Sequence, residues 1–313
     1  MTDLVANPFI GGLHMLDHPF LRYAFAAGTC IALASGLIGY FVVLRSQVFT
    51  GDALSHVAFT GSLAALALGI DLRVGLYGGC VVFALLMAFL GRRANADDTV
   101  IGSVFAWVLG LGALFLSIYT TTRSGSGGFS GNAGVTVLFG SIFGLSSGQA
   151  LTDAVVALVV AAALVLIARP LLFASLDEAV ASAQGVPVQA LGYVFFVLVG
   201  ITAGEATQAV GALLLLGLLA APAGAAQRLT PRPFAALWLS AAIAVVSVWV
   251  GLTLAYAFPR IPPSFGILSV ATACYLLSFL VTTGGRRLVA RGGAGGRGPG
   301  NHRNLVISHG EAS

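Results

Sequence analysis

Long apolar runs, separated by short polar or glycine-rich breaks, repeat along most of the chain. The runs lie at about 20–44, 47–69, 73–90, 99–120, 151–168, 190–204, 208–227, 234–257 and 265–282. Most approach the roughly 20 residues that a helix needs to cross the hydrocarbon of a bilayer, and the sixth is shorter. The pattern predicts an all-α integral membrane protein, a polytopic bundle of about eight or nine transmembrane helices.

Composition strengthens this prediction. Of the 313 residues, 58% are hydrophobic and only 8% are charged, with a mean hydropathy of +0.98. Soluble domains carry about 25% charged residues. The net charge of +4 is not gathered into a basic block, so no nucleic-acid partner is expected, and the surrounding partner is membrane lipid.

The arginines indicate an orientation. The helix ends that we assign to the cytoplasm carry Arg45, Arg92, Arg93, Arg169, Arg228, Arg232, Arg286 and Arg287. The opposite ends carry Arg22, Arg73, Arg123 and Arg260. Because cytoplasmic loops are enriched in positive charge, the N-terminus is expected outside and the C-terminus inside.

Three regions follow from these runs. Residues 1–19 are expected to form an external tail, residues 20–283 the membrane domain, and residues 284–313, rich in Gly and Arg, a disordered cytoplasmic tail. Within the membrane domain, the segment 121–150 is rich in Gly and Ser. Its apolar part, about 135–147, is too short to span and is interpreted as a surface-lying or re-entrant piece.

The second apolar run carries two ionisable residues near its start. Asp52 and His56 are four residues apart, which places them on one helix face with Cβ atoms roughly 5–6 Å apart. A carboxylate and an imidazole so placed can bind the same divalent cation. The alternatives are a helix-capping role for Asp52 and a packing role for His56. Ionisable residues in a membrane helix favour the functional interpretation.

Two other acids lie in apolar stretches. Glu205 is expected near the external end of the short sixth helix, where it would touch the metal route or face water or a partner protein. Asp153 is expected to begin a helix, because the helix dipole favours acids there.

A short helix is predicted over about 175–185. Ser175 and Glu178 have the spacing of a capping box, and Gly185 can end the helix. About ten residues cannot cross a bilayer, so this is an interfacial helix on the cytoplasmic side. It is either an ordinary loop helix or a docking element for a cytoplasmic partner.

Several segments, in order along the chain, carry short motifs of glycine, proline and ionisable residues. They are Gly51-Asp52-Ala53-Leu54-Ser55-His56, Leu138-Phe139-Gly140, Leu176-Asp177-Glu178-Ala179 with Gly185-Val186-Pro187, Val210-Gly211-Ala212-Leu213-Leu214 with Pro222-Ala223-Gly224-Ala225-Ala226, and Pro262-Pro263-Ser264-Phe265-Gly266. Together they resemble the metal-transporting ABC-3 family, the membrane subunits of zinc and manganese ABC importers, over about residues 20–283.

The resemblance implies a permease of the bacterial cytoplasmic membrane that pairs with a second copy, cytoplasmic ATPase subunits and an extracytoplasmic metal-binding protein. Such a chain is not an enzyme and holds no permanent cofactor; the absence of a GxxxxGK[ST] loop agrees. The cargo would be Mn2+ or Zn2+, with Fe2+ as a third option, held by Asp52 and His56 and with Glu205 as a further candidate. The residues expected to couple to the ATPase are Asp177, Glu178, Ala179 and Gly185.

Other functions remain open on the sequence. A stand-alone secondary metal transporter or channel would use the same ionisable pair, although no clear repeat of halves is visible. A permease for chelated metal, of the siderophore type, is a second alternative. An intramembrane metalloprotease would need an H-E-x-x-H motif, which the sequence lacks.

Overall fold

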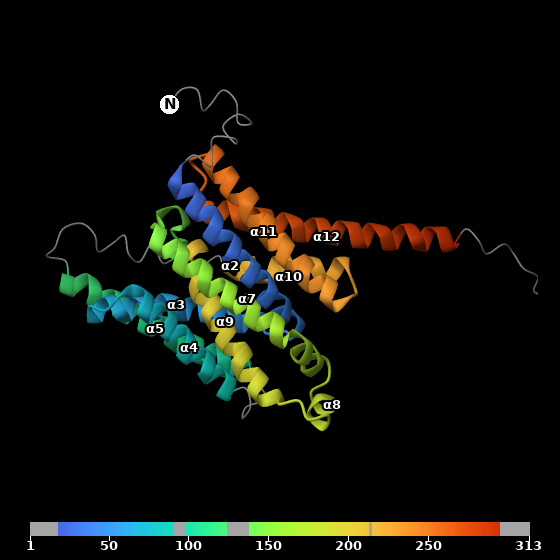
Figure 1. Ribbon diagram of the computed structural model, residues 1–313, viewed down its shortest axis with the longest axis horizontal. Coiled ribbons are helices and arrows are strands. Elements are labelled where there is room, and N and C mark those ends of the chain that lie inside the picture. Colours follow the sequence, from blue (N-terminus) through green and yellow to red (C-terminus); the bar gives the residue numbers. More distant parts are fainter. Residues whose placement is uncertain (1–17, 91–97, 124–137, 213–214, 295–313) are drawn as a thin grey trace, which may run out of the picture.

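The computed structural model describes residues 18–90, 98–123, 138–212 and 215–294, and every regular element in these ranges is a helix (Figure 1). The elements are α2 (Pro19–Leu44), α3 (Val48–Leu68), α4 (Leu72–Leu90), α5 (Asp98–Arg123), the 3-10 turn η2 (Ile142–Gly144), α7 (Ser147–Leu176), α8 (Glu178–Ala183), α9 (Val188–Val210), α10 (Leu215–Leu229), α11 (Pro233–Ala257) and α12 (Pro263–Ala294). The predicted all-helical membrane fold is confirmed, and each of the nine predicted runs corresponds to one long helix.

Three helices extend beyond their predicted ends. Helix α7 continues through Pro170 to Leu176, and α9 is a full-length helix of 23 residues. Proline is tolerated inside membrane helices because neighbouring helices and side chains satisfy the freed backbone groups. Helix α12 continues to Ala294, so the prediction of disorder from residue 284 is wrong for its first part. The predicted tails at 1–17 and 295–313 lie outside the described residues.

Seven of the helices are long and apolar enough to cross a membrane: α2, α4, α5, α7, α9, α11 and α12. Helix α10 has only 15 described residues. Helix α3 has 21 residues, but Asp52, His56 and several hydroxyl residues lower its hydropathy. The helix with the candidate metal ligands is therefore among the least membrane-like, which fits a helix surrounded by protein.

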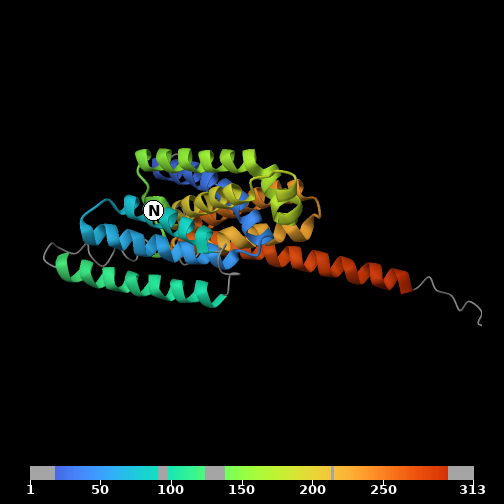
Figure 2. The same cartoon turned by 90° about the horizontal axis from the view of Figure 1, so that it is seen from below.

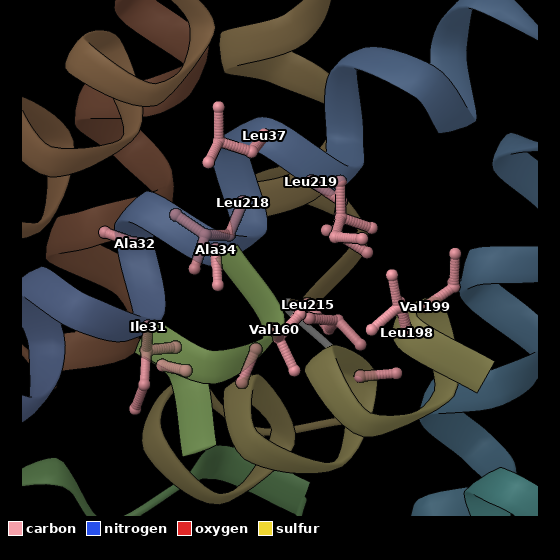
Figure 3. Close-up of a cluster of buried hydrophobic side chains, with 14 of the residues drawn as sticks. Ile31, Ala32, Ala34, Leu37, Val160, Leu198, Val199, Leu215, Leu218 and Leu219 are labelled. Carbon is pink, nitrogen blue, oxygen red and sulfur yellow. The ribbon is translucent and has the colours of Figure 1, made fainter. Parts of the chain in front are cut away.

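Helix α2 lies at the centre of the bundle. It is the most buried of the spanning helices, whereas α5 and α12 are the least buried. Figure 2 shows α7 and α5 along opposite faces of the bundle and α12 projecting beyond it. The core is made by aliphatic side chains from α2, α7, α9 and α10, among them Ile31, Leu37, Val160, Leu198, Leu215 and Leu219 (Figure 3).

Hydrogen bonds between helices, and places where two helix backbones come close, show how α2 packs on α11 and α3 on α4. Helices α2 and α11 are antiparallel, because Ser240 Oγ donates to the Gly36 carbonyl at 2.7 Å and Trp249 Nε1 donates to Thr29 Oγ1 at 2.8 Å. Helices α3 and α4 cross at Gly61 and Gly75, where a Cβ on either glycine would overlap the backbone of the other helix. Small residues permit this approach where lipid supplies no hydrophobic drive for association.

The segment before α7 packs against the end of α9 and the start of α12. Ser141 N–H donates to the Gln208 carbonyl at 3.1 Å, and Ser264 Oγ donates to the Phe139 carbonyl at 2.9 Å. This brings the 138–140, 210–212 and 262–266 segments together at one place, although they are far apart in sequence. Of the predicted re-entrant piece at 135–147, residues 135–137 lie outside the described residues, and the rest is a turn packed on α9.

Candidate functional site

Asp52 and His56 lie one turn apart on the partly open face of α3. His56 Nε2 is 4.0 Å from Asp52 Oδ1. The side chains are 17% and 28% exposed for His56 and Asp52, respectively, so solvent or another chain can reach both. The pair is close enough to share one cation and is not sealed inside the chain.

Neighbouring groups hold this face in place. Ser55 Oγ donates to the Asp52 carbonyl at 2.6 Å, within the same helix. The His56 ring meets the Phe105 ring of α5 edge-on, with centroids 5.1 Å apart. Thr60 Oγ1 donates to the Val108 carbonyl at 3.0 Å, which ties α3 to α5 one turn further on. The imidazole thus packs against α5, while part of its side chain stays exposed.

One chain supplies only part of a metal coordination sphere here. Divalent metals such as zinc take four ligands in closed sites and three protein ligands in open sites. Within the described residues, no group of three or more His, Cys, Asp or Glu side chains is placed to hold a metal ion. The pair can bind a cation transiently, and further ligands must come from elsewhere.

Glu205, the third predicted ligand, does not join this pair. It is 1% exposed and lies inside α9, because that helix continues to Val210 and does not end near Gly204 as predicted. Its charged neighbour is Asp153 of α7. Asp153 does not begin its helix either: Ser146 caps α7 in a capping box with Gln149, and Asp153 is buried two turns in.

The predicted short helix between α7 and α9 exists, with a different cap. Ser175 Oγ donates to the Leu171 carbonyl inside α7, so the Ser175–Glu178 capping box is wrong. Asp177 is the N-cap of α8 instead, and its carboxylate accepts from Val180 N–H at 2.9 Å. The helix has six residues, and Gly185 follows it with φ of 81°, a conformation that favours glycine.

Helix α8 presents an exposed surface on a fixed base. Glu178 and Ala179 are exposed, whereas Ala181 is buried against Ala174 and Val188. The Arg45 guanidinium at the end of α2 lies 5.3 Å from the centroid of the Phe195 ring. Burial lowers the pKa of Arg45, and the nearby Glu178 carboxylate acts in the opposite direction. The corner between α2 and α3 is therefore close to α8.

Sequence reasoning missed a group of polar residues inside the bundle. Arg73 Nη1 of α4 lies 3.5 Å from Asp153 Oδ1 of α7, and the charges of Arg73, Asp153 and Glu205 all act on the Tyr77 hydroxyl. The available signal was that Arg73 and Asp153 are charged residues at the edges of apolar runs. Their partners could not be predicted, because the contacts join three helices.

Comparisons with known proteins agree on one family. Residues 17–282 match the ABC 3 transport family. The chain is 27% identical over 273 residues to the manganese transport system membrane protein MntC of Listeria monocytogenes, covering 87% of this chain and 93% of that protein. It is 28% identical over 278 residues to the manganese import system permease protein ScaB of Streptococcus parasanguinis, covering 87% and 94%.

A solved structure has the same architecture. PsaBC from Streptococcus pneumoniae in complex with Fab contains a chain that superposes with a TM-score of 0.76 at 25% identity, covering 89% of this chain and 97% of that one. With seven apolar helices of spanning length, these similarities make the chain a multi-pass protein of the bacterial plasma membrane.

Proposed function

The chain belongs to the ABC 3 transport family, and from this premise we propose that it is the permease through which an ATP-driven importer carries Mn2+ into the cell. Zn2+ and Fe2+ are the alternative cargoes. ATP hydrolysis belongs to separate subunits in this proposal, and the metal is the cargo and not a resident cofactor.

The observation that carries the proposal is the Asp52–His56 pair. It is the one carboxylate–imidazole contact, at 4.0 Å, among the described residues, and the rest of its helix consists mainly of small and apolar residues. Its partial exposure leaves room for ligands from outside the chain. Ionisable groups that face a cavity or partner inside a membrane protein are costly to keep and are typical of transport pathways.

A second copy of the chain would complete the site. Two copies of α3 facing each other supply two carboxylates and two imidazoles, a set of oxygen and nitrogen ligands that accepts both Mn2+ and Zn2+. Raw affinity favours Zn2+ over Mn2+, so geometry and availability must select the cargo. The relatives named for manganese transport support Mn2+ as the first expectation.

Helix α8 is the proposed contact with the ATPase. Asp177, Glu178, Ala179 and Gly185 lie on or directly beside it, at the end of the bundle that carries Arg45 and Arg169. A movement of α8 would be transmitted to α3 through Arg45, which lies in the short turn between α2 and α3. Such coupling transports metal only if the cargo or an external metal-binding protein interacts differently with the two states.

Metal uptake in a strain lacking the gene tests the proposal. Cells without the chain are expected to lose most uptake of radioactive Mn2+ at low external concentration, with a fall in cell manganese measured by mass spectrometry. The same uptake assay with Zn2+ and with Fe2+ shows which ion depends most on the chain and is therefore the cargo. Unchanged uptake of all three ions would contradict the proposal, and a defect seen only with chelated iron would favour the siderophore-type alternative.

A further inference from the structure

One aromatic ring of α5 lies against the face of α3 that carries the candidate metal ligands. The Phe105 ring and the His56 imidazole have centroids 5.1 Å apart and an interplanar angle of 74°. The same Phe105 ring lies 5.9 Å from the ring of Phe49, measured between centroids. Phe49 and His56 are seven residues, or about two helical turns, apart on one side of α3. Phe105 therefore packs against both of these side chains.

The packing of α5 on α3 fixes the position of Phe105. Helix α5 packs chiefly against α3. Thr60 Oγ1 donates to the Val108 carbonyl at 3.0 Å, and a Cβ at Gly112 would lie only 2.7 Å from the same hydroxyl oxygen. Thr60 is one turn after His56, and Val108 is about one turn after Phe105. The hydrogen bond therefore holds the two helices in the register that brings Phe105 to His56.

The His56 imidazole is held by packing and not by a hydrogen bond. A histidine that binds a metal usually donates its other ring N–H to a carboxylate or carbonyl oxygen, which fixes the direction of the ring. In the part of the chain that the structure describes, the imidazole has no hydrogen-bond partner, and Asp52 Oδ1 is 4.0 Å from Nε2, beyond hydrogen-bond distance. The contact with Phe105 therefore restrains the ring in place of that hydrogen bond.

We propose that Phe105 is a positioning residue of the metal site and sets its preference among divalent ions. This inference rests on the proposed function, in which Asp52 and His56 bind the cargo. Phe105 does not bind the ion itself. Its ring keeps the imidazole where Nε2 lies beside the Asp52 carboxylate, so that one ion can contact both side chains. Phe49 packs against the same ring and supports it.

The preference follows from the ligand chemistry of the two ions. Imidazole suits Zn2+, whereas carboxylate and water oxygens suit Mn2+. An imidazole held in the correct direction therefore contributes more to the binding of Zn2+ than to that of Mn2+. An aromatic pair contributes about two- to tenfold to an equilibrium constant. Loss of the Phe105 ring should therefore weaken Zn2+ binding several-fold and Mn2+ binding less, whereas a general disturbance of the fold would weaken both alike.

Binding of the two ions to the purified full chain in lipid nanodiscs tests the inference. The electron paramagnetic resonance signal of free Mn2+ gives the Kd for Mn2+, and displacement of bound Mn2+ by Zn2+ gives the Kd for Zn2+. Phe105→Leu keeps an apolar side chain and removes the ring. We expect it to raise the Kd for Zn2+ by about three- to tenfold and the Kd for Mn2+ by less than about twofold. Phe105→Tyr keeps the ring and should restore both values.

Trp107→Leu is the matched control. It removes an aromatic ring from the same helix, at a position that is 66% exposed, and should change neither Kd. Equal weakening of both ions by Phe105→Leu, an unchanged Kd for Zn2+, or failure of Phe105→Tyr to restore binding would overturn the inference and leave the proposed function standing. A wild-type chain that binds no Mn2+, or binding that persists in Asp52→Asn/His56→Ala, would contradict the proposed function and this inference together.

Discussion

At the scale of single residues, the chain places its membrane acids in two different surroundings. Asp52 and His56 are partly exposed and lie beside each other on one helix. Asp153 and Glu205 are fully enclosed between helices. A residue on an open face can exchange ligands with a passing ion, whereas an enclosed residue must be neutralised where it stands. The partial exposure of the first pair therefore supports the transport role that we propose for Asp52 and His56.

The first prediction concerns the open pair. Asp52→Asn keeps the size of the side chain and removes its charge, and His56→Ala removes the imidazole. Each should lower Mn2+ uptake by at least about tenfold, the loss expected when a metal ligand or its supporting group is removed. Protein levels should stay normal, because removing a charge from a membrane helix lowers its desolvation cost. Uptake in cells and immunoblots of the membrane fraction give the two readouts.

Ser55→Ala is the matched control for this pair. Ser55 is buried between the two residues, and its hydroxyl bonds only to the Asp52 carbonyl of its own helix. Uptake should be retained in this variant. If the Asp52 and His56 variants instead reduce protein levels together with uptake, the pair has a structural role and not a ligand role.

Sequence could reveal the open pair Asp52–His56, but not that Arg73, Asp153 and Glu205 would lie inside the bundle. Asp52 and His56 face the same way because a helix turns 3.6 residues at a time, which is local geometry. Arg73, Asp153 and Glu205 are separated by 80 and 52 positions, as their numbers show (153 − 73 and 205 − 153), and they meet only when α4, α7 and α9 pack. That meeting depends on long-range packing, which no local pattern encodes.

At the scale of elements, the sequence predicts which helices exist but not the residues at which they begin and end. Apolar length identifies each long helix, because lipid demands about 20 apolar residues per crossing. The residue at which a helix ends depends on one capping residue and on the neighbouring helices. The apolar run was predicted to end at residue 168, but α7 continues through Pro170 to Leu176, and Asp177 rather than Ser175 caps α8. Helix α8 is therefore shorter than predicted, Glu178–Ala183 instead of about 175–185, although it does lie between α7 and α9.

The second prediction concerns the α3–α4 crossing. In Gly75→Ala the new Cβ would overlap the Gly61 carbonyl and Ala65 Cβ. The helices must then move apart, at a cost of about 1–3 kcal/mol, typical of overpacking. Gly78→Ala, on the same helix with nothing within 4 Å of the new atom, is the control. After heating, the fraction of protein that stays monodisperse should fall for Gly75→Ala and not for Gly78→Ala. Equal thermal stability of the two variants would contradict the close crossing of α3 and α4.

The third prediction concerns α8. Glu178→Lys and Ala179→Arg alter exposed positions of a helix whose buried side, at Ala181, is untouched. The membrane domain should fold normally and lose its ATPase subunit during purification. A wrong charge in an interface costs several kcal/mol, and each 1.4 kcal/mol is about tenfold in affinity. Ala235→Arg, at an equally exposed position on α11, is the control. Co-purification at the normal ratio would argue against docking at α8.

At the scale of the whole molecule, the proposals require that α8 and the metal entrance lie on opposite sides of the membrane. Helix α2 sets the distance between the two ends. At its start, the His18 ring lies 6.4 Å from that of Tyr256, beside the loop that joins α11 to α12. At its end, Arg45 approaches α8. The 26 residues between them span about 39 Å at 1.5 Å per residue, more than the hydrocarbon thickness of about 30 Å.

The fourth prediction fixes which end faces the cytoplasm. Arg45 and Arg169 lie at the α8 end, and the arginine distribution along the chain favours that end as the inner one. The test places single cysteines at Arg260, in the loop after α11, and at Ser182 on α8, both exposed. Cys30, Cys80 and Cys274 are first replaced by alanine so that only the new thiol can react.

A membrane-impermeant maleimide should label Arg260→Cys in intact spheroplasts and Ser182→Cys only after the membrane is opened. This outcome places α8 where a cytoplasmic ATPase can reach it and leaves the 138–140 and 262–266 segments facing an external metal-binding protein. The reverse labelling would put α8 outside, and no cytoplasmic protein could then drive α3 through the Arg45 corner. Transport coupling would have to be sought at the other end of the bundle, around Phe139 and Ser264.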